Sequence, residues 1–82
     1  MEVQMVELVE YIAKSLVDNP DSIKLESKEN DEQIDISLYV LQSDMGKVIG
    51  RQGKIAKAIR GVLKAVSLKE NKRVNLEIEE LE

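Results

Sequence analysis

Residues 33 to 41, QIDISLYVL, switch between polar and aliphatic side chains almost residue by residue, and this alternation restricts the fold more than any other segment. Successive side chains on a β-strand point to opposite faces, so the aliphatic ones share one face. They are Ile34, Ile36, Leu38 and Val40. An apolar face needs cover, and a strand needs hydrogen-bonded neighbours. The segment therefore predicts one strand of a sheet whose other face meets solvent.

Two further segments show the same alternation. Residues 22 to 28, SIKLESK, place Ile23 and Leu25 on one side, and residues 73 to 79, RVNLEIE, place Val74, Leu76 and Ile78 inward. Both segments are predicted strands. The polar stretch ENDE, residues 29 to 32, separates the first two strands and is typical of a turn. We therefore expect these two strands to form an antiparallel hairpin.

Three other segments have apolar residues at helical spacing. Residues 2 to 17 form an amphipathic pattern that stops ahead of the chain's single proline. A short helix is expected to have Ser43 or Asp44 as its N-cap and to end at Gly50. A longer helix is expected over residues 54 to 68. Its predicted apolar face consists of Ile55, Ile59, Val62, Leu63 and Val66.

The predicted order is helix, strand, strand, short helix, longer helix, strand. The last two strands are joined through two helices, and a right-handed crossover of that kind makes them parallel. The hairpin adds an antiparallel neighbour. We therefore expect an α+β fold in which a three-stranded mixed sheet carries three helices on one face, in the order α-β-β-α-α-β. At 82 residues the chain is predicted to form one domain over residues 1–82.

Charge is distributed unevenly along the chain. The formal net charge is −4, which by itself argues against binding to a polyanion. Seven of the 12 basic residues nevertheless lie between Met45 and Lys69, and that segment contains none of the 16 acidic residues. Because salt screens charges beyond about 10 Å, a ligand in contact with this segment meets its local positive field. The segment is therefore a candidate site for an anion.

Two glycines bound the junction of the two later helices, in the sequence Gly50-Arg51-Gln52-Gly53. Glycine adopts positive φ easily, so it can end one helix and let the chain enter the next at a sharp angle. Free N–H groups at the start of the second helix attract anions. Without Cβ atoms at its two ends, the loop lets a phosphodiester approach its backbone, while Arg51 and Gln52 point outward. The same spacing also suits a plain tight corner between two helices, and on spacing alone this alternative stays open.

The run DMGKVIGRQGKIAKAIR, residues 44 to 60, resembles the GXXG loop and flanking helices of KH domains. With the small size and the leading helix and strand, the chain is similar to the bacterial single-domain KH proteins of the KhpA family, also called YlqC-like RNA-binding proteins, in the type II arrangement. The resemblance implies a loop that clamps about four nucleotides of single-stranded RNA by their backbone. It also implies a role as a post-transcriptional regulator or RNA chaperone. The candidate nucleic-acid contacts are Lys47, Gly50, Arg51, Gln52, Gly53, Lys54 and Lys57.

The residues that read bases are not identified by this pattern. Many KH domains carry a large aliphatic residue three positions after the second glycine, where this chain has Ala56 beside Ile55. A loop that contacts only phosphate groups also does not distinguish RNA from DNA, because it makes no contact with the 2′-hydroxyl. The pattern therefore fits single-stranded DNA as well as single-stranded RNA.

The composition argues against an enzyme. The chain has no histidine and no cysteine, which removes the usual general base, the thiol nucleophile and the soft metal ligands. The GRQG loop lacks the Gly-Lys-Ser/Thr ending of a P-loop. We therefore expect no catalytic residues, no metal site and no cofactor.

The main alternative is a protein-interaction or dimerisation module with weak or no RNA binding. A small core is expected to leave apolar surface on the short helix and at the start of the next one, around Met45, Val48, Ile49 and Ile55. The family resemblance implies a homodimer or a complex with a larger Jag-type KH protein. Salt distinguishes the two functions, because RNA binding weakens steeply with salt and apolar association does not.

Nothing in the sequence points to a membrane. No apolar run approaches the ~20 residues of a membrane span, and the acidic N-terminus MEVQMVELVE lacks the basic start of a signal peptide. The absence of cysteine fits a reducing compartment. We expect a soluble, cytoplasmic protein.

Overall fold

The secondary structure of the chain follows the predicted order in a computed structural model, which describes residues 2–69 and 71–81. The helices are α1 (Glu2–Leu16), α2 (Gln42–Ile49) and α3 (Lys54–Lys69), and the strands are β1 (Lys24–Glu29), β2 (Gln33–Val40) and β3 (Arg73–Glu80). Two short 3-10 helices, η1 (Pro20–Ser22) and η2 (Arg51–Gly53), follow α1 and α2. The predicted order α-β-β-α-α-β is confirmed.

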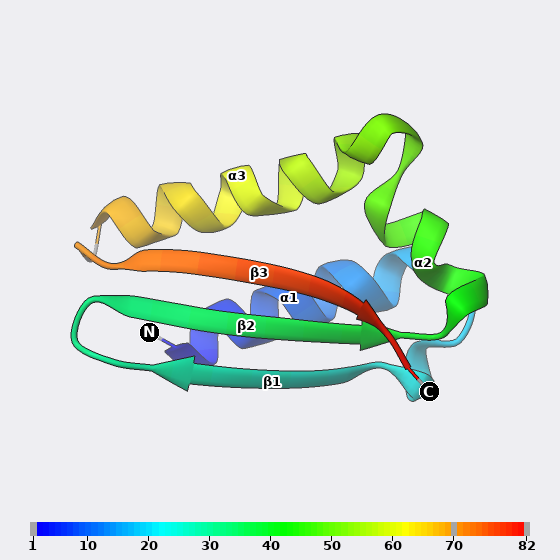
Figure 1. The fold of residues 1–82 in the computed structure, drawn as a ribbon, viewed down its shortest axis with the longest axis horizontal. Coiled ribbons are helices and arrows are strands. Elements are labelled where there is room, and N and C mark those ends of the chain that lie inside the picture. Colours follow the sequence, from blue (N-terminus) through cyan, green and yellow to red (C-terminus); the bar gives the residue numbers. More distant parts are fainter. Residues whose placement is uncertain (1, 70, 82) are drawn as a thin grey trace.

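The three strands form one sheet in the order β1-β2-β3 (Figure 1). β1 pairs with β2 in the antiparallel direction, with Leu25 opposite Leu38. β2 pairs with β3 in the parallel direction, with Ile36 opposite Leu76. The predicted hairpin and the predicted parallel crossover are both confirmed. β3 is an edge of the sheet, and α3 runs alongside it (Figure 1).

The aliphatic face of β2 is the centre of the hydrophobic core. Ile36 is completely buried there, and all three helices pack against this face, through residues such as Met5 of α1, Val48 of α2 and Leu63 of α3. Burying an aliphatic side chain of this size contributes about 1.5–3 kcal/mol, so this face holds the helices in place. Within the described residues no helix covers the opposite face, where Tyr39 is partly exposed (Figure 1).

The start of α2 differs from the sequence prediction, which placed Ser43 or Asp44 at the N-cap. The helix begins at Gln42, the N-cap position is Leu41, and no side chain caps the helix there. Ser43 and Asp44 both lie in the first turn. The backbone N–H of Asp44 donates to the Leu41 carbonyl at 2.8 Å, so Asp44 is already part of the helical turn.

The carboxylate of Asp44 forms its hydrogen bonds with another segment of the chain. Asp44 is 1% exposed. Its carboxylate accepts hydrogen bonds from the backbone N–H groups of Asp18 and Asn19, both at 3.2 Å, and from the Asn19 side chain at 3.1 Å. The N-cap prediction was wrong because the carboxylate ties the chain after α1 to the first turn of α2 instead of capping its own helix.

The core-facing side of α3 is narrower than predicted. Its buried residues are Ala56, Ile59, Leu63 and Ser67. Val62 was predicted on the apolar face, but it is 46% exposed. Successive residues on a helix are about 100° apart, so a face centred on Leu63 turns Val62 towards solvent.

Candidate nucleic-acid interface

The predicted loop begins where α2 ends. Gly50 has φ 77° and ψ 174°, and its N–H donates to the Gly46 carbonyl at 2.9 Å, which closes the last turn of the helix. Residues 51 to 53 form the single turn η2, in which the Gly53 N–H donates to the Gly50 carbonyl at 3.1 Å. α3 begins directly afterwards at Lys54. The chain therefore passes from one helix to the next through one tight turn.

Glycine is required at Gly50 for two separate reasons. Its φ of 77° lies in the left-handed region, and a Cβ there would lie 2.6 Å from Cγ1 and 2.9 Å from Cβ of Ile55. Ile55 packs against the core and has little freedom to move away. At Gly53 the φ of 75° alone favours glycine, since an added Cβ would meet nothing within 4 Å. The loop backbone therefore stays bare at both ends.

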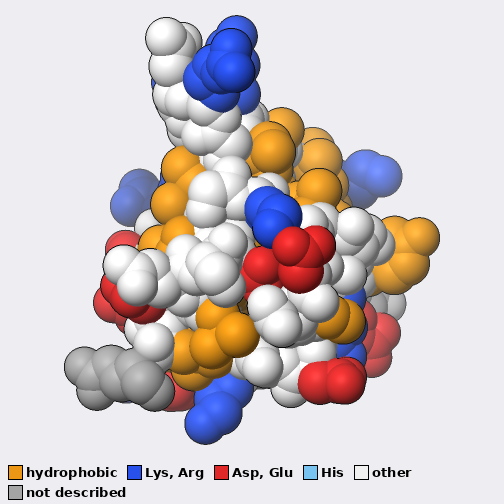
Figure 2. Space-filling view, turned by 90° about the vertical axis from the view of Figure 1, so that its right-hand side faces the viewer, with side chains coloured by type: hydrophobic (Ala, Val, Ile, Leu, Met, Phe, Trp, Pro, Cys, Tyr) orange, Lys and Arg blue, Asp and Glu red, His pale blue; other side chains and the backbone are white. Residues whose placement is uncertain are grey.

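The two middle residues of the loop face outward. Arg51 and Gln52 are both exposed. Gln52 has φ 59° and ψ 24°, a left-handed conformation that costs a non-glycine residue roughly 1–2 kcal/mol. Such outliers gather at functional sites. Figure 2 shows the loop as a projection at the top of the view, with Lys and Arg side chains on it.

The positive surface continues along α3. Lys54, Lys57, Arg60 and Lys64 are all exposed, and their spacing of three or four residues places them along one side of the helix. The first turn of α3 contains no acidic residue. The partial positive charge of the helix N-terminus therefore adds to these side-chain charges without a competing carboxylate.

Lys47 differs from the other predicted contacts because its charge is paired inside the protein. Its Nζ donates to Oδ2 of Asp18 at 2.5 Å and lies 3.8 Å from Oδ1 of Asp44. The hydrogen bond to Asp18 and the charges of the two carboxylates outweigh partial desolvation and raise the pKa of Lys47. The free positive charge at the loop therefore comes mainly from Arg51 and from the lysines of α3.

Asp44 remains ionised at neutral pH. Its burial disfavours the charged form, but hydrogen bonds from the side chain of Asn19 and from the backbone N–H groups of Asp18 and Asn19, with the charge of Lys47, lower the pKa of Asp44. The carboxylate therefore stays available as an acceptor for the chain that follows α1.

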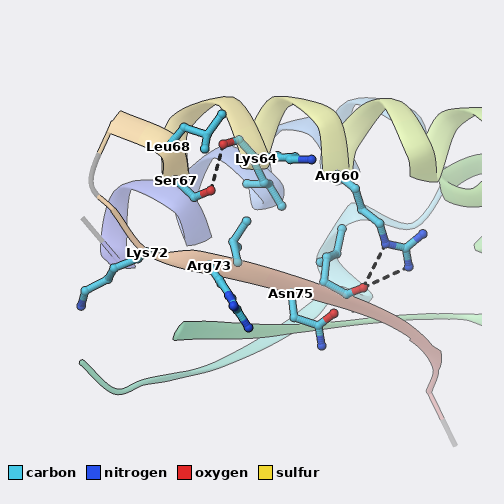
Figure 3. A pocket seen from close by; sticks show the side chains of 10 residues that line it. Arg60, Lys64, Ser67, Leu68, Lys72, Arg73 and Asn75 are labelled. Carbon is cyan, nitrogen blue, oxygen red and sulfur yellow. Dashed lines mark hydrogen bonds between the residues drawn. The ribbon is translucent and has the colours of Figure 1, made fainter. Parts of the chain in front are cut away.

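A cavity of about 370 Å³ lies between α3 and the edge strand β3 (Figure 3). A volume of this size is typical of small-ligand sites. Leu63 and Leu76 contribute apolar walls. The charged residues that line it are Arg60, Lys64, Lys72 and Arg73, and among the described residues no acidic side chain lines it. Lys72 pairs with Glu29, so the positive rim of the cavity comes from Arg60, Lys64 and Arg73.

Arg60 connects the two sides of this cavity. Its Nε and Nη2 donate to the backbone carbonyl oxygen of Leu76, at 3.2 and 3.0 Å. Figure 3 shows the side chain reaching from α3 to β3, with both hydrogen bonds meeting the same oxygen. The contact joins the helix that carries the loop to the edge strand.

The cavity residues are absent from the sequence prediction of the site. The predicted contacts stop at Lys57, whereas Arg60 and Lys64 continue the same stripe towards the cavity. The spacing of these basic residues was the feature of the sequence from which Arg60 and Lys64 could have been predicted as part of the site. Arg73 and Asn75 belong to β3, and sequence periodicity does not show which helix faces a given strand.

The apolar residues that were expected to form a free surface around α2 pack against the core of the protein instead. Val48 is completely buried, and Met45, Ile49 and Ile55 are partly buried residues that pack against the core. The expectation of a free apolar surface there was wrong because the sheet and α3 take up the apolar side of α2.

An exposed and uncharged stripe lies on α3 instead. Val62 is 46% exposed and Leu68 is 69% exposed. Three small residues at helical spacing from them are also exposed. We call this surface the outer face of α3, and it consists of Ala58, Gly61, Val62, Ala65 and Leu68.

The described residues contain neither a membrane-spanning helix nor a metal cluster. No helix among residues 2–69 and 71–81 is both long and apolar enough to cross a bilayer. Within the same ranges, no three carboxylates form a group that could hold a metal ion.

Comparisons with known proteins agree on one family. A family model described as "KhpA/KhpB, KH domain" matches residues 6–78. A Clostridium perfringens protein named RNA-binding protein KhpA is 57% identical over 74 residues, which are 90% of this chain and 99% of the relative. A Borreliella burgdorferi protein of the same name is 52% identical over 73 residues, which are 89% of this chain and 89% of the relative.

A solved structure shares the fold at low sequence identity. Part of Era from Aquifex aeolicus, in a crystal structure with GDP and aluminium fluoride, superposes with a TM-score of 0.68 at 19% identity. The match covers 98% of this chain and 31% of that chain. At this identity the likeness concerns the fold alone.

Proposed function

The chain belongs to the KhpA/KhpB family of KH-domain proteins, and on this premise we propose that it binds single-stranded RNA. The loop from Gly50 to Gly53 grips the backbone of about four nucleotides. The geometry of the loop carries the proposal, because Gly50 has no room for a side chain and Arg51 is exposed beside it. The name of the relatives, RNA-binding protein KhpA, supports the same function.

Phosphate groups meet two kinds of donor at this loop. Backbone N–H groups at the start of α3 and the helix dipole attract an anion. The exposed side chains of Arg51, Gln52 and Lys54 add hydrogen bonds and charge. Lys57 extends the charge along α3, whereas Lys47 contributes less because a neighbouring carboxylate pairs with it.

The site suits a single strand better than a duplex. In a duplex the base edges are paired and the phosphate spacing is rigid, so a narrow projecting loop finds few contacts. The two aromatic residues of the chain lie elsewhere, with Tyr11 on α1 and Tyr39 on the uncovered face of the sheet. Aromatic stacking contributes about 1–3 kcal/mol per base where it occurs, so we expect moderate affinity here.

Titration of one RNA sequence as a single strand and as a duplex tests this function. We expect the single strand to bind and the duplex to bind weakly. With two or three phosphates neutralised, the slope of log K against log salt should be roughly −1.5 to −2. Equal binding of the duplex would reject the clamp. Tighter binding of single-stranded DNA of the same sequence would identify DNA, and not RNA, as the preferred ligand.

We also propose that residues 1–82 fold as a single KH-like domain that acts on RNA in the cytoplasm, as a post-transcriptional regulator or RNA chaperone. Similarity to the Clostridium perfringens relative over 90% of this chain supports the single domain. The names of the relatives describe RNA binding and no chemical reaction, which agrees with a protein that is not an enzyme.

Self-association through the outer face of α3 is a second candidate function. The partner we propose is a second copy of this chain, because a stripe on one helix can pair with itself about a two-fold axis, the commonest symmetry of homo-oligomers. Gly61 has open space around it, so a partner helix can approach closely. Val62 and Leu68 supply the exposed apolar area. A larger Jag-type KH protein is the alternative partner for the same face.

A further inference from the structure

We propose that Asp18 limits the affinity of the protein for RNA, because its carboxylate holds the ammonium group of Lys47 away from the phosphate chain. Once released, Lys47 adds a phosphate contact beside the loop from Gly50 to Gly53. The inference rests on the proposed RNA binding and adds to it a residue that restrains the binding. Asp18 acts through Lys47 and is therefore a positioning residue.

Lys47 differs in its pairing from the other basic side chains predicted to contact RNA. Its Nζ donates to Oδ2 of Asp18 at 2.5 Å and lies 3.8 Å from Oδ1 of Asp44. The other three form no salt bridge with a residue in the ranges 2–69 and 71–81, and they are Arg51, Lys54 and Lys57. One of the four predicted cationic contacts is therefore bound to the protein's own carboxylates.

The backbone fixes Asp18 next to Lys47. The N–H of Asp18 donates to Oδ1 of Asp44 at 3.2 Å, and Asp44 lies one turn before Lys47 on α2. An ion pair between exposed side chains is normally weak, since ordering both of them costs entropy. Here the junction already holds the two residues side by side, so less freedom is lost. A flexible RNA strand loses freedom when it is ordered, which favours the internal pair over a phosphate.

Lys47 is close enough to the loop to contact RNA when it is free. It lies three residues before Gly50, or about 4.5 Å along α2 at 1.5 Å per residue. Its side chain is 42% exposed, and a lysine carries its charge on a flexible four-carbon stem. The ammonium group can therefore contact a phosphate next to the one held at the loop.

Asp44 does not replace Asp18 as the partner of Lys47. The Asp44 side chain is 2% exposed and already accepts three hydrogen bonds from the chain that follows α1. Its Oδ1 lies 3.8 Å from Nζ of Lys47, which is beyond hydrogen-bond distance. The side chain of Asp18 is 73% exposed, so its charge can be removed without loss of core packing.

The test titrates a single-stranded RNA octamer of mixed sequence into the parent and into Asp18→Asn at several salt concentrations. We expect the variant to bind on the order of threefold more tightly, the effect of freeing one exposed ion pair. The slope of log K against log salt should become steeper by about 0.7, which corresponds to one more neutralised phosphate. Asp18→Glu keeps the carboxylate and should bind like the parent.

Asp21→Asn is the matched control, because it changes the net charge equally at an exposed position three residues away. It should raise the affinity less than Asp18→Asn does and leave the salt slope unchanged. Asp18→Asn combined with Lys47→Met has the net charge of the parent but lacks the ion pair. We expect this double variant to bind RNA with the affinity and the salt slope of the parent, because Lys47 is required for the gain.

Thermal unfolding is recorded for every variant. Asp18→Ser is a second uncharged variant, and the same gain in affinity is expected from it.

Three results would overturn the inference and leave RNA binding in place. Asp18→Asn would bind with the affinity and slope of the parent, Asp21→Asn would give an equal gain and an equal slope, or the double variant would keep the threefold gain. Failure of the folded parent to bind the octamer would reject the proposed function and the inference together.

Discussion

Gly50 and Gly46 lie four residues apart at the end of α2, and an added methyl group has opposite consequences at the two positions. A Cβ at Gly50 would meet Ile55 at 2.6 Å, and φ there is 77°. A Cβ at Gly46 would meet nothing within 4 Å, and Gly46 lies within the helix. The pair therefore separates a glycine required by geometry from one that is replaceable.

We expect Gly50→Ala to lower the free energy of unfolding by at least about 2 kcal/mol, because a left-handed residue costs roughly 1–2 kcal/mol and overpacking adds about 1–3 kcal/mol. Gly46→Ala should raise it by about 0.5–1 kcal/mol, the difference between alanine and glycine inside a helix. Urea unfolding followed by circular dichroism measures both. Similar effects of the two substitutions would contradict the close contact between Gly50 and Ile55.

The charge of the loop can be reversed without touching the core. Arg51→Asp combined with Gln52→Asp is expected to abolish RNA binding, since the loop then carries two carboxylates beside the N–H groups that attract phosphate. Like charges at about 5 Å repel by a few kcal/mol at an effective dielectric of about 20. Stability should change by about 0.5 kcal/mol or less, because both residues are exposed.

The matched control for this variant changes the net charge equally on α1. Tyr11→Glu with Lys14→Glu replaces two exposed side chains there, and RNA binding should fall only slightly. RNA titration and thermal unfolding are measured on each protein. A loop variant that melts and binds RNA like the parent would remove the Gly50 to Gly53 loop from the site.

At the scale of elements, one buried carboxylate joins the chain at the end of α1 to the first turn of α2. Asp44 in the first turn of α2 accepts three hydrogen bonds from the chain that follows α1. Lys47, one turn further along α2, pairs with Asp18 in the same region. Since α2 leads directly into the loop, this junction positions the loop relative to α1.

Asp44→Asn is expected to lower stability at neutral pH, because a neutral carboxamide is a weaker acceptor than a carboxylate. The pKa of Asp44 is lowered by folding, so its contribution is complete above the usual value of 3.8 and is lost as the pH falls below that value. The stability difference between parent and variant should therefore be constant from neutral pH down to this value and shrink below it.

Urea unfolding at a series of pH values checks this expectation. Asp31→Asn serves as the control, because Asp31 is exposed in the turn between β1 and β2. The control should unfold like the parent at neutral pH. A stability difference for Asp44→Asn that persisted unchanged well below pH 3.8 would mean that its charge does not hold the junction.

At the scale of the whole molecule, the two faces of the sheet differ in charge. The pKa of Tyr39, on the uncovered face, is raised by the charge of Glu26, by partial burial and by the charge of Glu79. The uncovered face carries acidic and basic side chains side by side, whereas the loop and the exposed side of α3 carry basic side chains without acidic ones. RNA is expected to approach from the side of the helices even though the net charge of the chain is −4.

Oligomeric state is the second prediction at this scale. We expect the parent to sediment as a dimer at tens of micromolar and Leu68→Glu to sediment as a folded monomer. Each copy contributes one Leu68, and burial of a leucine is worth about 1.5–3 kcal/mol, so the dissociation constant should rise on the order of hundredfold. Gln4→Glu, an equal change of charge at an exposed position of α1, should leave the dimer intact.

A parent that sediments as a monomer would reject self-association through the outer face of α3. A dimer that survives Leu68→Glu would move the interface to another surface. If the parent is monomeric but Leu68→Glu abolishes binding to a larger KH protein, the outer face serves that partner instead.

Much of the fold was predictable from the sequence because its signals are local. The alternation around Ile36 and the helical spacing of α3 follow from the periods of strands and helices, which involve only nearby residues. The handedness of crossovers then determines that β2 and β3 are parallel. The positive φ of Gly50 and Gly53 is likewise a local property of glycine.

The remaining features depend on contacts between residues far apart in the sequence. Asp44 bonds to Asn19, 25 residues away, so it does not cap its own helix. Lys47 pairs with Asp18, 29 residues away, so a predicted contact for RNA is partly neutralised. Arg60 bonds to the Leu76 carbonyl across a cavity that exists only once α3 lies beside β3.

The sequence by itself therefore determined the order of elements, the direction of the strands and the glycine-bounded loop. The tertiary structure decided which charges near that loop are free, where the cavity lies and which apolar residues of α3 stay exposed. Periodicity shows which side of an element is apolar, but it does not show which residue of another element that side meets. The packing of helices on the sheet makes that choice, because a buried side chain is placed by all the elements around it at once.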